Sequence, residues 1–309
     1  KQRPLMTPIL NSALETAGSI ILGKPQQLKL ALTCLLARGH LLIEDIPGVG
    51  KTTMAQTLAR TLGLEFRRIQ FTSDLLPADV LGVSIYKQDD HRFEFQQGPI
   101  FSQLVLADEV NRASPKTQSA LLEAMEEKQV TIDGISHALP VPFFVVATQN
   151  PNYQIGTFPL PESQLDRFLM RIELGYPAQQ AERDLLMQRE RRDMLEEIKP
   201  VMTPDMLNKC QQAVNKIHVS EALISYIIAL VHESRHSPNY REGLSPRAGL
   251  GLRRCAQSWA LISGRDHVIP EDVQAVLDAV VTHRLMSTDE TQQQHHQIAE
   301  QLLQAVPIP

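Results

Sequence analysis

The stretch Gly48-Val49-Gly50-Lys51-Thr52 determines how the first half of this chain folds. It follows the apolar run Leu41–Glu44 and precedes 51–62, a segment with the composition of a helix. Glycines at such a strand-to-helix turn let backbone N–H groups point inward, and the helix start adds its positive end. The stretch predicts a phosphate-binding loop, in which Lys51 reaches the outer phosphates of a nucleotide and the Thr52 hydroxyl binds Mg²⁺.

The loop departs from the general phosphate-loop pattern at one position. The pattern G-x-x-x-x-G-K-[ST] requires glycine at position 45, where this chain has Asp45. On this stretch alone, an ordinary glycine-rich turn between a strand and a helix therefore remains an alternative. The residues that we assign to the nucleotide here are Pro47, Gly48, Val49, Gly50, Lys51, Thr52 and Thr53.

The length, composition and charge of the chain are those of an ordinary globular protein. The chain has 309 residues, of which 43% are hydrophobic and 21% charged, as expected of a globular protein with one large or two smaller domains. A net charge of −5 gives no overall attraction to nucleic acid or to an anionic membrane. No apolar run approaches the ~20 residues of a membrane-spanning helix. Cys34, Cys210 and Cys255 are interpreted as free thiols in a reducing compartment, so we expect a cytoplasmic location.

Apolar strands alternate with helices through the first half, which predicts an α/β fold with a parallel sheet covered on both faces. The expected strands are 41–44, 66–71, 104–107, 143–147 and 170–174, and the expected helices are 51–62 and 121–127. Residues 83–95 and 130–139 are predicted to form β-hairpins with polar tips at 87–91 and 133–136, ordinary connecting loops being the alternative.

The composition becomes helical after Pro177. Residues 181–198 are rich in Arg, Glu and Leu, a helical composition, and helices are expected to begin near Thr203, Ser220, Ser245 and Pro270, where capping residues or prolines stand. The predicted organisation is an α/β nucleotide-binding core over 1–177 and an all-helical domain of five or six helices over 178–309.

Two carboxylates point to hydrolysis. Asp108 and Glu109 end the buried strand 104–107, and ligands of α/β sheets bind at the carboxyl ends of the strands. Asp108 is predicted to hold Mg²⁺, and Glu109 to activate the water that attacks the terminal phosphate. An Asp-Glu pair is common by chance, but its place after a phosphate loop favours an ATPase that converts ATP and water to ADP and phosphate.

Three more polar residues are candidates on weaker grounds. Asn150 follows the fourth strand, and its amide can orient the water or contact the terminal phosphate, although a strand-end cap is the alternative. Arg167 precedes the fifth strand, and Arg247 begins a helix of the second domain, from which it could bridge to the nucleotide. An isolated arginine is more often a solvated surface charge.

Taken together, these segments resemble MoxR-type AAA+ ATPases over nearly the whole chain. The resemblance rests on Glu44–Thr52, Ala107–Ala113, Ala147–Pro151, Leu160–Phe168, Gly243–Ala248 and Val306–Pro309. Asp45 agrees with that family although it departs from the general pattern.

The resemblance implies a fold and roles for single residues. It implies an AAA+ core with sheet order 5-1-4-3-2 and a C-terminal helical lid domain. Asn150 would be sensor 1, Arg247 sensor 2, and Arg167 an arginine finger that acts in the site of the neighbouring subunit. The two hairpins would be inserts that face the pore or rim of a ring. Residues 20–23, with Ile21 and Gly23, would line the adenine pocket.

The resemblance also implies a ring, most often a hexamer, that matures or remodels protein clients, often with von Willebrand factor A domain partners. A slow nucleotide-dependent switch or scaffold is the alternative. A nucleic-acid remodeller is less favoured, because the acidic balance and an aromatic content of 5% give no nucleic-acid footprint.

One motif points elsewhere. His232-Glu233-Ser234-Arg235-His236 matches the zinc-protease pattern H-E-x-x-H, whose two histidines share a helix face. Pro238 follows closely, Glu242 is the only nearby candidate for a third ligand, and the motif lies in the helical domain. We therefore interpret it as an ordinary helix segment.

Overall fold

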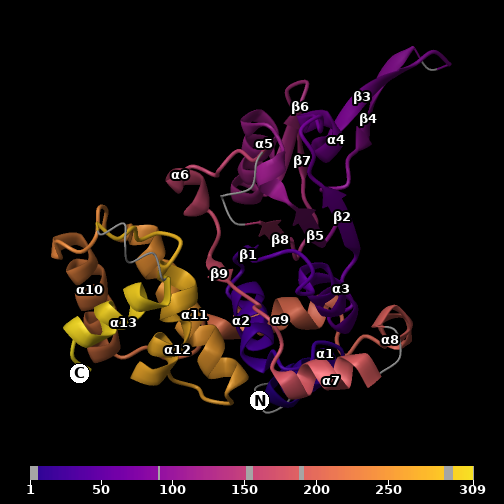
Figure 1. The fold of residues 1–309 in the computed structure, drawn as a ribbon. Coiled ribbons are helices and arrows are strands. Elements are labelled where there is room, and N and C mark those ends of the chain that lie inside the picture. The colour runs from indigo at the N-terminus through magenta and orange to yellow at the C-terminus, as the bar shows by residue number, and fades with distance from the viewer. Residues whose placement is uncertain (1–5, 90, 151–155, 188–190, 289–294, 309) are drawn as a thin grey trace.

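A computed structural model describes residues 6–89, 91–150, 156–187, 191–288 and 295–308. Its centre is a parallel five-stranded sheet (Figure 1). From one edge to the other, the strands are β2 (Phe66–Gln70), β5 (Leu104–Asp108), β8 (Phe144–Gln149), β1 (Leu41–Glu44) and β9 (Met170–Ile172). With these strands numbered 1 to 5 in chain order, the observed order is 2-3-4-1-5, which confirms the predicted 5-1-4-3-2 sheet.

Both faces of the sheet are covered, which explains why its central strands are apolar except at their carboxyl ends. Every residue of β5 and β8 is buried. Because successive side chains of a strand point to opposite faces, Leu104 and Leu106 join one hydrophobic cluster, whereas Val105 and Ala107 join another. The cluster that contains Leu104 continues into α1 (Met6–Ile20), α2 (Pro25–Leu36) and α3 (Lys51–Thr61). The other continues into α4 (Pro77–Leu81) and α5 (Pro115–Glu127).

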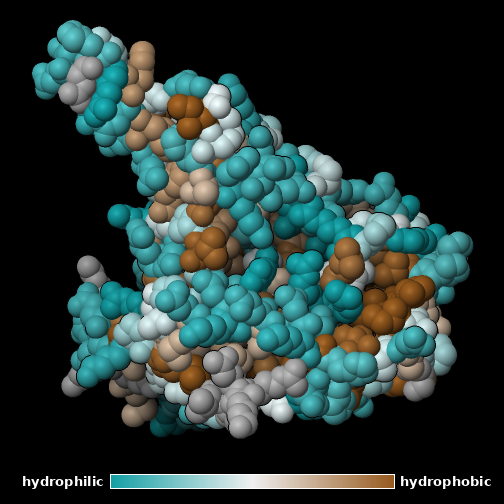
Figure 2. All heavy atoms as spheres, turned by 180° about the vertical axis from the view of Figure 1, so that it is seen from behind, coloured by the Kyte–Doolittle hydropathy of each residue, from teal (hydrophilic) through white to brown (hydrophobic). Residues whose placement is uncertain are grey.

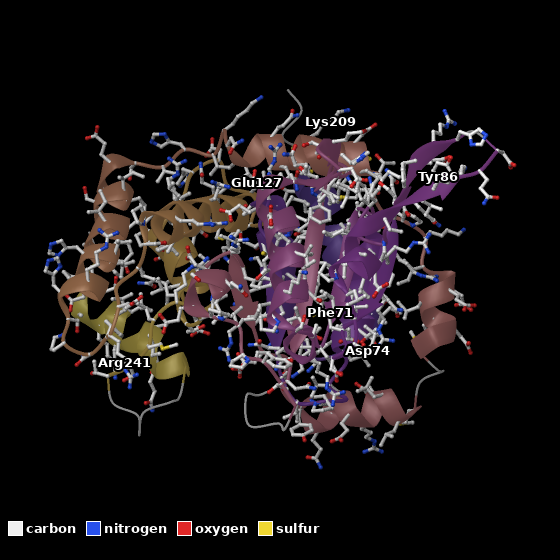
Figure 3. All side chains as sticks on the ribbon, turned by 90° about the horizontal axis from the view of Figure 1, so that it is seen from above. Phe71, Asp74, Tyr86, Glu127, Lys209 and Arg241 are labelled. Carbon is white, nitrogen blue, oxygen red and sulfur yellow. The ribbon has the colours of Figure 1, made fainter. Side chains whose placement is uncertain are left out.

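Two antiparallel hairpins leave this core, as predicted. One consists of β3 (Gly82–Lys87) and β4 (Arg92–Gln97), the other of β6 (Gln129–Ile132) and β7 (Ile135–Ala138). The polar tip expected at 133–136 is shorter, because Asp133 and Gly134 both have positive φ and close a two-residue turn. The β3–β4 hairpin projects from the molecule (Figure 2), and Tyr86 marks it in Figure 3.

The second half is helical in its described part, with seven helices where five or six were expected. Four are α9 (Pro204–Val214), α10 (Glu221–His236), α11 (Pro246–Ile262) and α12 (Pro270–Val281). Thr203, Ser220 and Ser245 cap three of them by accepting hydrogen bonds from backbone N–H groups, as their sequence predicts. The last is α13 (His295–Ala305). No described helix combines the length and the apolar character needed to cross a bilayer.

The helical structure expected over 181–198 falls into two helices. The structure has α7 (Gln179–Met187) and α8 (Arg191–Glu197), and residues 188–190 lie outside the described part. Each helix packs on a different part of the core: Ala181 of α7 lies beside Gly23, and the carbonyl of Leu195 in α8 accepts a hydrogen bond from Arg60 in α3. The boundary near residue 177 falls between β9 and α7, and it stays a prediction that it separates two domains.

Candidate functional site

Four of the predicted site residues meet at the carboxyl edge of the sheet. The Lys51 ammonium donates a hydrogen bond to Oδ1 of Asn150, at 3.1 Å. Nδ2 of Asn150 donates in turn to Oε1 of Glu109, at 3.0 Å. Asp108 immediately precedes Glu109, at the end of β5. They meet because β1, β8 and β5 are parallel neighbours, so that their carboxyl ends lie at one edge.

The phosphate loop has the predicted backbone. Gly48 and Gly50 have φ of 87° and 98°, a region that favours glycine, and Gly50 is the residue before α3. The first N–H groups of α3 have no side-chain cap at Gly50, so this positive helix end faces the loop. The Lys51 ammonium lies within the loop and also donates to the carbonyls of Asp45 and Ile46. Burial lowers the pKa of Lys51, and carboxylates, Asp45 foremost, oppose that shift.

Asp45 explains why this loop lacks the usual glycine. Its Oδ2 accepts hydrogen bonds from the backbone N–H groups of Leu174, at 2.7 Å, and Gly175, at 2.6 Å. Its Oδ1 accepts one from the N–H of Ile46, at 2.8 Å. The carboxylate thereby ties the start of the phosphate loop to the chain that leaves β9, a link that glycine cannot make.

Asp108 is buried and both its carboxylate oxygens are engaged. The Thr148 hydroxyl donates to Oδ1 at 2.6 Å. Arg68, on the neighbouring strand β2, donates to Oδ2 from Nε at 3.0 Å and from Nη2 at 2.6 Å. Sequence reasoning missed Arg68, because its pairing with Asp108 depends on the register between β2 and β5.

Glu109 is oriented by its backbone and by three side chains. Its φ is 56°, a left-handed conformation that is uncommon for glutamate and is found at functional sites. Besides Asn150, its carboxylate accepts hydrogen bonds from Gln70, at 3.1 Å, and Arg112, at 3.2 Å. Its N–H donates to the Thr148 hydroxyl, at 2.9 Å. Gln70 and Arg112 were not predicted from the sequence.

The predicted Mg²⁺ ligands, Thr52 and Asp108, have a suitable donor chemistry. Mg²⁺ is usually bound by one or two protein oxygen ligands together with waters and substrate phosphates. A buried carboxylate and a hydroxyl in the first turn of α3, beside the phosphate loop, fit that pattern. Within the described residues, no group of three or more His, Cys, Asp or Glu side chains is arranged to hold a metal by itself.

A cavity of about 320 Å³ adjoins the phosphate loop. Its lining comes from the loop, from the segment after α1, from the chain after β9 and from α7: Ile21, Leu22, Lys24, Gly48, Val49, Gly50, Leu174, Tyr176, Pro177, Glu182, Leu185 and Leu186. Ile21, for which the resemblance implies a contact with adenine, is among the residues that line this cavity. Gly23, with φ of 70°, packs against α7: a Cβ at this position would lie 2.8 Å from Cβ of Ala181. The contribution of α7 was not foreseen.

The two candidate arginines are not part of the Lys51 cluster. Nε of Arg167 lies 3.1 Å from one carboxylate oxygen of Glu126, and Nη1 of Arg247 lies 3.0 Å from the other. Glu126 is in the last turn of α5, and the preceding carbonyl, of Met125, is 3.3 Å from Nε2 of His40. His40 stands just before β1, so both arginines lie toward the amino edge of the sheet, opposite the phosphate loop.

The H-E-x-x-H segment shows no sign of a metal site. His232 and His236 lie in α10 with their rings stacked, the centroids 3.9 Å apart, and Nδ1 of His236 donates to the carbonyl of His232 at 2.9 Å. The three cysteines are buried, and burial raises the pKa of Cys255 to about 12 and that of Cys210 to about 11.

Comparison with known proteins agrees with this geometry. Residues 40–170 match the ATPase family associated with various cellular activities (AAA), and residues 232–305 match the AAA lid domain. Over 305 residues the chain is 45% identical to the uncharacterized protein YeaC of Bacillus subtilis (strain 168), covering 98% of this chain and 95% of YeaC. It is 41% identical over 288 residues to Chaperone MoxR1 of Mycobacterium tuberculosis, covering 90% and 76%.

A solved structure extends the agreement to the whole fold. A Cytophaga hutchinsonii protein assigned as an ATPase superimposes with a TM-score of 0.91 at 37% identity, covering 100% of this chain and 97% of that protein. The sheet order, the phosphate loop and these relatives lead to one conclusion: the chain belongs to the MoxR family of AAA ATPases.

Proposed function

We propose that this chain hydrolyses ATP to ADP and phosphate at the carboxyl edge of its sheet. The observation that carries the proposal is the continuous network from Lys51 through Asn150 to Glu109, beside Asp108. It joins a cation for phosphate, an amide that can orient water and a carboxylate that can accept a proton. The adjoining cavity, with Ile21, would hold the adenine base, and Gly23 would shape its wall.

Each residue has a distinct task in the proposed reaction. Lys51 and the N–H groups of residues 47–53 would hold the β- and γ-phosphates. Glu109 would take a proton from the attacking water, with Asn150 fixing the direction of that carboxylate. Mg²⁺, held by Thr52 and Asp108, would neutralise charge on the phosphates.

A ring of six subunits would complete the site. Arg167 is the proposed arginine finger. It lies with Glu126 toward the amino edge of the sheet, whereas the Lys51 cluster lies at the carboxyl edge, and this separation favours action in the site of a neighbouring subunit. Arg247 lies beside it on Glu126, so the same reasoning favours the neighbour's nucleotide for Arg247 too. In this proposal Glu126 holds the two guanidinium groups together until phosphate replaces it.

The work driven by hydrolysis would be the remodelling or maturation of protein clients in the cytoplasm, with von Willebrand factor A domain proteins as candidate partners. Support comes from the relative named Chaperone MoxR1. The projecting β3–β4 hairpin, with Val83, Ile85, Tyr86 and Phe93 exposed, offers apolar side chains to a client.

A slow nucleotide-dependent switch is the second candidate, and one contact favours it. Arg68 pairs with Asp108, so Mg²⁺ would have to compete with this ion pair. Turnover measured with and without a client would separate the two: strong stimulation supports a motor, and uniformly slow turnover supports a switch.

Two variants test the proposal. Lys51→Ala should lose nucleotide binding, whereas Glu109→Gln should bind ATP and scarcely hydrolyse it. Affinity purification from the native source with Glu109→Gln should then retain clients in the presence of ATP, with Lys51→Ala as the matched control. ATP hydrolysis by Glu109→Gln at the unaltered rate would refute the assigned chemistry. Equal client recovery by both variants would refute nucleotide-dependent client binding.

A further inference from the structure

Arg284, three residues beyond the end of α12 at Val281, holds the segment that carries Arg167. Its side chain is 5% exposed. Nε donates to Oδ1 of Asp166 at 2.6 Å, and Nη2 donates to the carbonyls of Asp166 at 3.2 Å and Phe168 at 2.6 Å. Nη1 donates to the carbonyl of Leu169 at 3.1 Å. Arg284 therefore bonds to the chain on both sides of Arg167.

Other groups of the helical half bind the same segment. Nε2 of His283 lies 2.9 Å from the carbonyl of Phe168. The Ser245 hydroxyl, two residues before Arg247, lies 3.5 Å from Oδ2 of Asp166. Within the α/β core, the Leu169 N–H bonds to the carbonyl of His40, at 2.9 Å. Residues 166–169 are thus held between the core and two places in the lid, the residue that precedes α11 and the turn that follows α12.

We propose that Arg284 is a positioning residue, which sets the place of Arg167 and passes lid movement to it. The proposal rests on the proposed role of Arg167 in a neighbour's site. A buried guanidinium with this many acceptors fixes the direction of a backbone segment better than one ion pair does. Because Arg284 follows a lid helix and residues 166–169 precede β9, a shift of α12 would change how Arg167 is presented.

A purely structural role for Arg284 makes a different prediction about which ATP site loses activity when Arg284 is replaced. If Arg284 only stabilises its own subunit, its loss should damage that subunit's own ATP site. If it positions Arg167, the damage should appear in the neighbour's site, and the variant's own site should work once a neighbour supplies an intact Arg167.

Mixed assemblies separate these outcomes. Lys51→Ala subunits bind no nucleotide but present an intact Arg167, and Arg284→Ala subunits bind ATP but present Arg167 poorly. Alone, Arg284→Ala should bind ATP within about twofold of the unaltered protein and hydrolyse it about 100-fold more slowly, the size of effect that a displaced catalytic group produces. Mixing the two should restore much of the turnover per Arg284→Ala subunit.

Controls keep the result interpretable. The pair Arg167→Ala and Lys51→Ala must also recover turnover; if it does not, the shared site itself is wrong. Recovery by that pair but not by the Arg284→Ala pair would overturn the role of Arg284 alone. Arg265→Ala, which removes a lid ion pair with Asp272 away from residues 166–169, should hydrolyse ATP normally.

Milder variants cover the case in which Arg284→Ala does not fold. Arg284→Lys keeps the charge but cannot span the same acceptors, and Asp166→Asn removes the charged partner. Both should show a smaller loss of turnover that Lys51→Ala subunits restore, with thermal melts close to that of the unaltered protein. Unaltered turnover in both would overturn the proposal.

Discussion

The side-chain amide of Asn150 donates to Oε1 of Glu109, at 3.0 Å, and its carbonyl oxygen accepts from Lys51, at 3.1 Å. Asn150 therefore connects the residue proposed to hold phosphate with the residue proposed to activate water. In the left-handed backbone of Glu109, this bond helps to fix where the carboxylate points. Hydrolysis should depend on that direction as well as on the carboxylate itself.

Glu109→Gln should keep ATP affinity within a few-fold and lower turnover by about 10²- to 10⁴-fold, because an amide cannot accept the proton of the attacking water. Phosphate release and fluorescent-nucleotide titration measure the two effects. Glu123→Gln, on an exposed position of α5, is the matched control and should behave as the unaltered protein. Equal losses of turnover in both variants would show that the loss does not come from removing the proton acceptor at Glu109.

Asp45→Gly restores the general phosphate-loop pattern and should nevertheless be harmful. It leaves the N–H groups of Leu174 and Gly175 without their acceptor and frees the loop backbone. We expect the free energy of unfolding to fall by about 1–3 kcal/mol, measured by denaturant titration, and nucleotide affinity to fall with it. A more stable Asp45→Gly protein with unchanged affinity would contradict the role given to this carboxylate.

Gly23→Ala should weaken nucleotide binding by displacing α7 from the cavity. The new Cβ would meet Ala181 at 2.8 Å and stand on a backbone with φ of 70°, which disfavours side chains by about 1–2 kcal/mol. Calorimetric titration with ADP measures the loss. Gly18→Ala is the matched control: it lies in α1 with open space around it, so it should be neutral or stabilise by up to about 1 kcal/mol. Similar ADP affinity for the two variants would contradict the packing argument.

His40 should make the protein less stable in mild acid. Burial lowers its pKa to about 4, while its Nδ1 accepts from the Val145 N–H at 3.0 Å. Between the unfolded pKa of ~6.5 and the folded pKa of about 4, only the unfolded chain binds this proton, so stability decreases as pH falls. The loss across that window should approach ~3 kcal/mol.

His40→Gln removes the titrating group, and its stability should depend less on pH over this interval. Denaturant titrations of both proteins at several pH values provide the comparison. Parallel curves for the two proteins would assign the acid sensitivity to other groups.

Local structure could be predicted from the sequence wherever the residues that determine it are adjacent in one short segment of the chain. The glycines around Lys51 and the apolar strand before Asp108 are such segments, and the structure confirms the strands and helix that they predict. Helix starts at Thr203, Ser220 and Ser245 were also predictable, because a cap and its first turn are adjacent in sequence.

Residues that act through tertiary partners were missed. The partner of Arg68 is Asp108, which becomes its neighbour only when β2 pairs with β5. The partners of Arg284 are residues 166–169, which are more than 100 positions away in the sequence. Helices α1 and α2 also went unpredicted: Lys24, which precedes α2, provides no side-chain cap. The segment 181–198 has helical composition, but its division into α7 and α8 follows from where each part packs.

The central claim, that hydrolysis needs Arg167 from a neighbouring subunit, is tested most directly by phosphate release per subunit over a range of protein concentrations. Sedimentation at the same concentrations would report assembly. For the unaltered protein, the rate per subunit should rise as subunits assemble. Arg167→Ala should bind ATP and assemble, yet stay about 1,000-fold slower throughout. A rate per subunit that is the same for dissociated and assembled protein, and is unchanged by Arg167→Ala, would contradict the shared site.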